Sequence, residues 1–123
     1  MDQSEIQISR VNSIYKLLSG TRFPLNSEKA LQEAIFIKLK HDFINLQREY
    51  VLDEHNRPDF YVAGVVIEIK ISGSAKDIYR QCERYCQFPD VHSLILVTNR
   101  SMGFPKEING KPCYVLNLGK AWL

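Results

Sequence analysis

The sequence lacks the long apolar runs that mark a membrane protein. Its longest apolar stretches, residues 62–67 and 94–97, are far shorter than the ~20 residues that a helix needs to cross a bilayer. The opening residues, MDQSEIQ, begin acidic and contain no apolar core of a secretion signal. Cysteine is also scarce: the chain has 3, an odd number, which disfavours a disulfide framework and fits a reducing compartment. We therefore expect a cytoplasmic protein that does not associate with a membrane.

An excess of charge of one sign is lacking as well. Lys and Arg number 16 and Asp and Glu 14, for a formal net charge of +2, so any basic surface that binds nucleic acid must be local. Hydrophobic residues make up 45% and charged residues 24%, which is typical of a globular protein and excludes a disordered or collagen-like chain. No internal repeat or low-complexity tract is present, and 123 residues fit one domain.

The hydrophobic pattern predicts an α/β protein with a mixed sheet flanked by helices. Gly20 follows the first helix, Asn26 or Ser27 caps the second, and Ser74 with Asp77 resembles a capping box for the third. The expected elements are helices over residues 5–19, 26–43 and 75–87, and strands over residues 46–53, 57–62, 65–71, 92–98 and 111–118. The middle three strands of this order predict an antiparallel meander.

We expect the single domain to span residues 1–123 in three parts. An N-terminal helix and loop occupy residues 1–25, a core occupies residues 26–99, and a C-terminal extension that ends in a strand occupies residues 100–123, with a loop expected over residues 102–110.

A tight turn at Ala63-Gly64 sets the register of the hairpin that carries the most informative residues. With a two-residue turn there, Asp59 lies directly opposite Glu68, with Cβ atoms roughly 5 Å apart. Like charges so placed cost stability, so a fold keeps them only for a cation or a shared proton. Because side chains alternate along a strand, Lys70 projects to the same face. The apolar side chains of that strand fill the opposite face, which we expect to be the buried one.

Two carboxylates and an ammonium group on one face suit the metal-assisted hydrolysis of a phosphodiester. Carboxylates bind Mg²⁺ through hard oxygens, and the metal polarises the phosphate and lowers the pKa of a bound water. Lys70 would orient that water, assist its deprotonation or stabilise the developing negative charge. The alternative interpretation is that Glu68 and Lys70 are solvated positions on an edge strand and that Asp59 belongs to a turn.

Pro58-Asp59, followed after a short hairpin by Glu68-Ile69-Lys70, resembles the PD-(D/E)XK nuclease superfamily, which has the restriction-endonuclease-like fold. The resemblance implies an αβββαβ core, and the expected order of elements matches it. It also implies that Asp59 and Glu68 are ligands of Mg²⁺, with Mn²⁺ as a substitute, that the Ile69 carbonyl is a backbone ligand, and that Lys70 is the catalytic lysine.

The superfamily often supplies one more catalytic glutamate from the helix before the meander. Glu28 and Glu33 are the candidates, and we choose Glu28 because it lies at the edge of the stripe that faces the sheet. Its other interpretation is a carboxylate that favourably meets the dipole of the first helical turn.

Gln81 and Tyr85 resemble the Gln-x-x-x-Tyr motif of RecB-like and phage-exonuclease-like members of the superfamily. At helical spacing they share one face, so both would reach the metal site or a DNA phosphate, although Tyr85 is as readily explained as a core residue. On the same helix, Cys82 and Cys86 are best interpreted as small buried apolar residues, since too few cysteines remain for a metal cluster.

Basic residues recur at every fourth position of this helix, at Lys76, Arg80 and Arg84. Beside a metal site, such a stripe would contact phosphates and give the salt-dependent affinity that the net charge does not. A solvated helix face is the more usual meaning of this pattern.

The resemblance thus implies a Mg²⁺-dependent DNA nuclease, acting on duplex or branched DNA in recombination or repair. One small domain has little surface for reading sequence, which favours structure- or end-selective cleavage and a homodimer that encloses the DNA. The small size fits a Holliday-junction-resolvase-like endonuclease, and the Gln-x-x-x-Tyr motif fits an exonuclease. The alternative is a non-catalytic nucleic-acid-binding module or subunit, with the same fold, in a larger restriction or recombination complex.

Overall fold

The structure is a computed structural model that describes residues 2–119. Within them lie the helices α1 (Gln3–Ser19), α2 (Glu28–Lys40) and α3 (Ala75–Tyr85). The strands of the same part of the chain are β1 (Gln47–Arg48), β2 (Phe60–Val62), β3 (Val65–Lys70), β4 (Ser93–Thr98), β5 (Glu107–Ile108) and β6 (Lys111–Asn117). The expected mixed α/β fold is confirmed, because helices flank a sheet with both parallel and antiparallel pairs. None of these helices combines the length and the apolar character that a bilayer crossing needs.

The strands form one sheet in the order β1-β2-β3-β4-β6-β5. The meander β1-β2-β3 is antiparallel as expected, and β4 lies parallel to β3 because α3 carries the chain back across the sheet. The last strand, β6, pairs with β4 in parallel, so it belongs to the interior of the sheet. The short strand β5 lies at the edge beside β6, within the segment expected to be only a loop.

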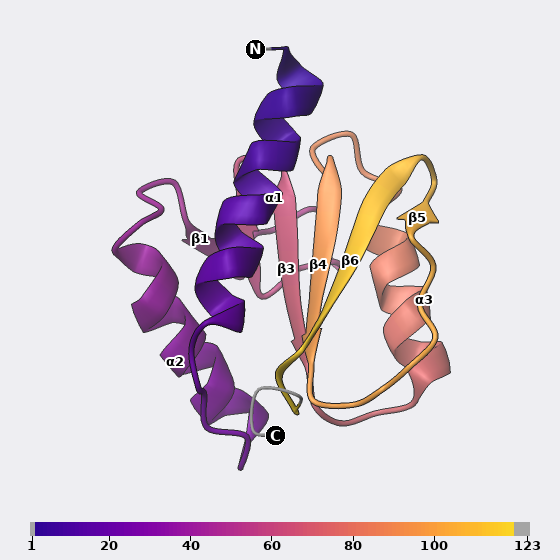
Figure 1. Cartoon of the computed structure of the whole chain (residues 1–123). Coiled ribbons are helices and arrows are strands. Elements are labelled where there is room, and N and C mark those ends of the chain that lie inside the picture. The colour runs from indigo at the N-terminus through magenta and orange to yellow at the C-terminus, as the bar shows by residue number, and fades with distance from the viewer. Residues whose placement is uncertain (1, 120–123) are drawn as a thin grey trace.

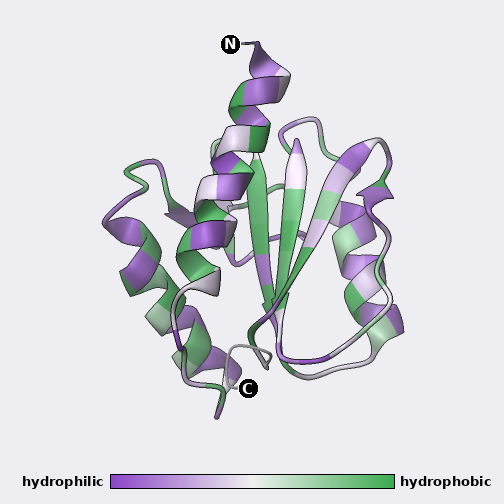
Figure 2. Cartoon of the chain, in the orientation of Figure 1, coloured by the Kyte–Doolittle hydropathy of each residue, from purple (hydrophilic) through white to green (hydrophobic). Residues whose placement is uncertain are grey.

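Helices cover both faces of the sheet (Figure 1). On one face α1 and α2 pack against the sheet, where Ile14, Leu31 and Ile67 belong to one buried apolar cluster. On the other face α3 packs against it, and Ile78 and Leu94 belong to a second cluster. Figure 2 shows that β3 and β4 are apolar over most of their length and that the polar residues of the helices lie toward the outside. The central strands are therefore buried on both sides.

Short polar side chains fix the beginnings of the helices. Asp2, Ser27 and Ser74 each accept a hydrogen bond from the backbone N–H three residues further along, at 2.8–3.1 Å. Of the two caps expected for α2, Ser27 is therefore the one used. The caps place the start of α2 just before Glu28 and the start of α3 beside the end of β3, and both placements bring candidate residues to the same end of the sheet.

The prediction of a strand over residues 46–53 is wrong in length, because β1 contains only Gln47–Arg48. Glu49 has a φ of 48°, in the left-handed region, which takes the chain out of the sheet. Its N–H makes one last hydrogen bond to the carbonyl of Asp59 (2.9 Å), and Leu52 then closes a turn with Asn56 (2.9 Å). The sheet therefore ends here, and residues 49–58 form a turn-rich loop beside the candidate site.

The turn between β2 and β3 has the conformation that its sequence predicts. Ala63 and Gly64 have φ angles of 42° and 102°, both positive, as a tight hairpin turn requires. β2 and β3 pair in the expected register, so Asp59, the residue before β2, lies opposite Glu68. The expectation that only one face of this hairpin is buried is wrong: Glu68, on the face that α3 covers, is 2% exposed. The reason is that β3 is a central strand with a helical layer on each side.

Candidate active site

Asp59 and Glu68 hold each other through the backbone at the open end of the β2–β3 hairpin. The N–H of Asp59 donates a hydrogen bond to Glu68 Oε1 (3.0 Å), and the N–H of Ile69 donates one to Asp59 Oδ2 (2.8 Å). Each carboxylate thus takes a hydrogen bond from the strand that carries the other. Both side chains are fixed in place by the register of the hairpin.

Burial makes this carboxylate pair electrostatically costly. Burial, and then the negative charge of Asp59, raise the pKa of Glu68 to about 8. Burial also raises the pKa of Asp59, against the opposing effect of the hydrogen bond from Ile69. The pair therefore favours a shared proton or a bound cation, as its sequence predicts.

Lys70 lies beside the pair, near the end of β3. Its Nζ is 3.5 Å from Glu68 Oε2, and its side chain is 24% exposed where that of Glu68 is 2%. The ammonium group is thus positioned by a buried carboxylate while it still reaches the surface. The alternative of two solvated residues on an edge strand does not hold, because Glu68 is buried and β3 is central.

Gln81 and Tyr85 of α3, which covers the face of the sheet that carries Glu68, lie next to this carboxylate. Gln81 Nε2 donates a hydrogen bond to the Tyr85 hydroxyl (2.8 Å), which donates one to Glu68 Oε2 (3.3 Å). Burial and the neighbouring Glu68 charge raise the pKa of Tyr85, so its hydroxyl stays a donor. Tyr85 is fully buried, and its predicted contact with nucleic acid is therefore wrong. It orients Glu68 instead. Cys82 and Cys86 of the same helix are buried, as expected.

Helix α2 brings Glu28 to the site and holds Glu33 away from it. Glu28 Oε1 accepts a hydrogen bond from the N–H of Ile71 (3.1 Å), directly after Lys70 in the chain, and its charge helps to raise the pKa of Asp59. Glu33 instead forms an exposed ion pair with Arg48. The structure therefore favours Glu28 over Glu33 as the carboxylate that the helix adds.

Gln32 belongs to the site and was missed from the sequence. Its Nε2 donates a hydrogen bond to Asp59 Oδ1 (3.2 Å), so it holds the oxygen of Asp59 that Ile69 does not. The available signal was its position one helical turn after Glu28, on the same face of α2. A groove of about 380 Å³ opens beside this cluster, lined by residues of α2, by the start of β2 and by Arg48 and Glu49.

The basic stripe of α3 divides into two parts. Lys76 and Arg80 are exposed and point away from the core. Arg84 is exposed too, but its Nε donates a hydrogen bond to Asn56 Oδ1 (3.1 Å), which ties α3 to the loop before β2. The residues left for a contact with phosphate are foremost Lys76 and Arg80.

The donors at this site fit a hard divalent cation. Asp59, Glu68 and the carbonyl of Ile69 are all oxygen donors, which Mg²⁺ and Mn²⁺ prefer, and a cation would relieve the repulsion that raises the pKa of Glu68. Within residues 2–119 no three His, Cys, Asp or Glu side chains converge as a metal site. The protein thus offers two carboxylates, in keeping with Mg²⁺, which binds through one or two carboxylates and retains waters.

Comparison of the chain with family models, curated proteins and solved structures finds no match. The interpretation of the site therefore depends on the residues of this chain and the contacts they make.

Proposed function

We propose that this chain is a Mg²⁺-dependent DNA nuclease that hydrolyses phosphodiester bonds and accepts Mn²⁺ in place of Mg²⁺. The observation that carries the proposal is the buried pair of Asp59 and Glu68 with Lys70 beside it, 3.5 Å from Glu68 Oε2. A purely structural role does not explain this arrangement, because two facing buried carboxylates repel each other. The element order from α2 to β4 further supports it, since it is the order that the resemblance to PD-(D/E)XK nucleases implies.

Asp59, Glu68 and the Ile69 carbonyl would hold the cation. When bound, Mg²⁺ supplies a water of lowered pKa and neutralises charge on the phosphate. The protein keeps these ligands ready through fixed hydrogen bonds: Gln32 and the N–H of Ile69 hold Asp59, and Tyr85 holds Glu68. Each ligand is thus positioned before the substrate arrives.

Lys70 is the proposed catalytic lysine. Its ammonium group is held by Glu68 yet reaches the surface, where it would orient the attacking water and stabilise the negative charge that develops on the phosphate. Glu28 adds a carboxylate next to Asp59 and assists with the attacking water. Gln81 acts through Tyr85 and sets the orientation of Glu68.

The proposed substrate is duplex or branched DNA, cut by structure or at an end. A specific protein–DNA interface buries roughly 1,000–2,500 Å² of protein, which at its upper end is more than a third of the 6920 Å² that the chain exposes. One copy has little surface left for reading sequence, which favours a homodimer around the DNA. The three described cysteines are free, in keeping with a reducing cytoplasm. The role proposed for the nuclease there is in DNA recombination or repair.

One assay tests the proposal. Purified protein is incubated with linear duplex, circular single strands and a four-way junction, each with Mg²⁺, with Mn²⁺ and with EDTA. We expect cleavage of at least one substrate in either metal, none in EDTA, and none by the variant Glu68→Gln. The other candidate is a non-catalytic DNA-binding module of the same fold, for which the exposed Lys76 and Arg80 of α3 would suffice. DNA binding without cleavage in both metals would establish that module and overturn the nuclease.

A further inference from the structure

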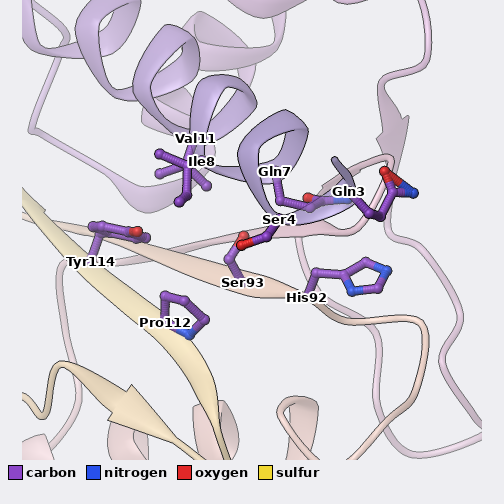
Figure 3. Close-up of a pocket in the computed structure, with 9 residues that line it drawn as sticks. All are labelled: Gln3, Ser4, Gln7, Ile8, Val11, His92, Ser93, Pro112 and Tyr114. Atoms are coloured by element: carbon purple, nitrogen blue, oxygen red, sulfur yellow. The ribbon is translucent and has the colours of Figure 1, made fainter. Parts of the chain in front are cut away.

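A second cavity lies at the opposite end of the sheet from the carboxylate pair. It has a volume of about 340 Å³ and lies between the first turns of α1 and the beginnings of β4 and β6 (Figure 3). Ser93 is the first residue of β4 and pairs with Val65, the first residue of β3. Glu68 and Lys70 lie toward the other end of β3. The cavity is therefore separate from the proposed active site.

Two of the residues that line this cavity each carry one buried polar side-chain atom that has no hydrogen-bond partner within the described chain. They are the Oγ of Ser93 and the Oε1 of Gln7. Ser93 is only 2% exposed, and Figure 3 shows its hydroxyl directed toward α1 across the cavity. A buried polar group without a partner costs stability, so each such group calls for an explanation.

Gln7 is held so that it presents an acceptor. Its Nε2 donates a hydrogen bond to the carbonyl of Ala63 (3.0 Å), and a carbonyl only accepts, so the amide cannot be reversed without losing that bond. The Oε1 is therefore the atom left for a ligand. Ser93 Oγ can both donate and accept. Together these two oxygens could pair with a ligand that carries an N–H donor next to an acceptor.

The remaining walls combine apolar side chains with the polar side chains of Gln3, Ser4 and His92. Ile8 and Val11 of α1 lie on one side, and Pro112 and Tyr114 of β6 lie on the other (Figure 3). None of the described lining residues is Asp, Glu, Lys or Arg, and His92 is the one basic side chain among them, so the lining offers an ion no carboxylate, ammonium or guanidinium group. The space between the apolar residues of α1 and β6 suits a neutral, flat ring with a polar edge.

We propose that this cavity binds a nucleobase. Each base is flat and neutral and carries an N–H donor next to an acceptor, so its N–H would donate to Gln7 Oε1 while the hydroxyl of Ser93 donates to the adjacent acceptor. The shared chemistry has two sources, a free nucleoside and a base within a strand. The proposal does not depend on cleavage, since it concerns binding at a separate site.

The test is a titration of metal-free protein in EDTA, followed through the backbone amide signals of Gln7, Ile8 and Ser93 by NMR. The probes are thymidine, 3-methylthymidine, which lacks the N3–H donor, and a short oligothymidylate. We expect thymidine to shift these signals and 3-methylthymidine to bind roughly ten-fold more weakly or not at all. If thymidine binds as tightly as the oligonucleotide, the ligand is a free nucleoside; tighter binding of the oligonucleotide indicates a strand.

A matched pair of variants separates binding from folding. Ser93→Ala removes an unpartnered hydroxyl, so we expect an unchanged or higher melting temperature together with roughly ten-fold weaker thymidine binding. Ser9→Ala, on an exposed position of α1 outside this cavity, should change neither. Equal binding of thymidine and 3-methylthymidine, equal binding by Ser93→Ala, or no shift with any probe would overturn the proposal. So would shifts by propionamide alone, which would indicate a peptide carboxamide.

The proposal and the nuclease can fail separately. Lys70→Ala should keep full thymidine binding, because Lys70 does not line this cavity. Loss of cleavage together with retained thymidine binding is therefore the expected result for that variant, and loss of thymidine binding would show that the cavity depends on the active site.

Discussion

The two ends of the sheet differ in how their buried polar groups are hydrogen-bonded and charged. At the end that carries Glu68, the carboxylate pair is held by hydrogen bonds, and the cost lies in the repulsion of like charges. At the end that carries Ser93, none of the described lining residues is an acid, a lysine or an arginine, and the cost lies in two atoms without hydrogen bonds. The first arrangement is prepared for a cation and a charged substrate. The second is prepared for a neutral ligand with its own donor and acceptor.

The largest expected effect is the loss of cleavage when either carboxylate loses its charge. Asp59→Asn and Glu68→Gln should each abolish cleavage in Mg²⁺, because the cation loses one of its two side-chain ligands. Stability without metal should change little, because the loss of one of two repelling charges offsets the one hydrogen bond that the new amide nitrogen cannot accept. The matched control is Glu33→Gln, which removes an exposed carboxylate from the same neighbourhood.

Cleavage assays and thermal melts in EDTA decide this prediction. A carboxylate variant that melts well below the parent and still cleaves at the full rate would show that the pair is structural. Ser93→Ala extends the comparison to the other end of the sheet, where we expect full cleavage.

The second effect separates chemistry from metal binding at Lys70. Lys70→Ala should lower the turnover number by roughly a hundredfold or more, because the water and the developing charge lose a positioned ammonium group. Binding of Mn²⁺, measured by calorimetry, should persist or strengthen, since a positive charge next to the cation is removed. Lys106→Ala, at an exposed position outside the site, is the control for charge alone. Loss of Mn²⁺ binding in Lys70→Ala would contradict the catalytic role.

The third effect concerns pH and stability without metal. Glu68 has a pKa of about 8 in the folded chain against an ordinary value of 4.5, so the folded state holds a proton that the unfolded state releases. Stability is then fully present below pH 4.5 and falls as the pH rises toward about 8, by a few kcal/mol at most. Denaturant unfolding in EDTA across this range measures the fall.

Glu68→Gln should remove most of this pH dependence, whereas Ser93→Ala should keep it, because no titratable group changes in the cavity. A parent protein whose stability stays flat between pH 5 and 8 would show that Glu68 is already ionised at the lower pH.

The features of the fold and of the candidate site that depend on neighbouring residues could be predicted from the sequence. Those that depend on the packing of distant segments could not. The Ala63-Gly64 turn fixes the hairpin register through neighbouring residues, so the opposition of Asp59 and Glu68 was predictable. The spacing of Gln81 and Tyr85 likewise placed both on one helix face. Both were expected to reach the metal site or a DNA phosphate, and the choice between these depends on where α3 packs: Tyr85 is buried and contacts Glu68.

Features that need distant segments escaped prediction. Gln32 reaches Asp59 only because α2 packs beside the hairpin. Gln7 and Ser93 line one cavity although they are far apart in the chain, because β4 lies parallel to β3 beneath α1. β1 ends earlier than expected because the backbone of Glu49 is left-handed, a conformation that a glutamate does not predict.

The smallest expected effect concerns the basic stripe on the exposed surface of α3. If Lys76 and Arg80 meet the DNA backbone, the double variant Lys76→Ala and Arg80→Ala should weaken DNA binding equally across sequences. The slope of log affinity against log salt should fall by roughly 0.9 for each duplex phosphate that the variant no longer neutralises. Cleavage at saturating DNA should fall less than affinity, because these groups would bind ground and transition states alike.

A salt series in Ca²⁺, a hard cation chosen to retain DNA while suppressing cleavage, measures the slope. Arg84→Ala is the informative companion, because Arg84 also donates a hydrogen bond to Asn56, so its removal should lower stability as well as weaken DNA binding. An unchanged slope in the double variant would mean that Lys76 and Arg80 form only a solvated face. The DNA path would then follow the groove beside Asp59 instead, where the cations are Lys29 and Arg48, the latter paired with Glu33.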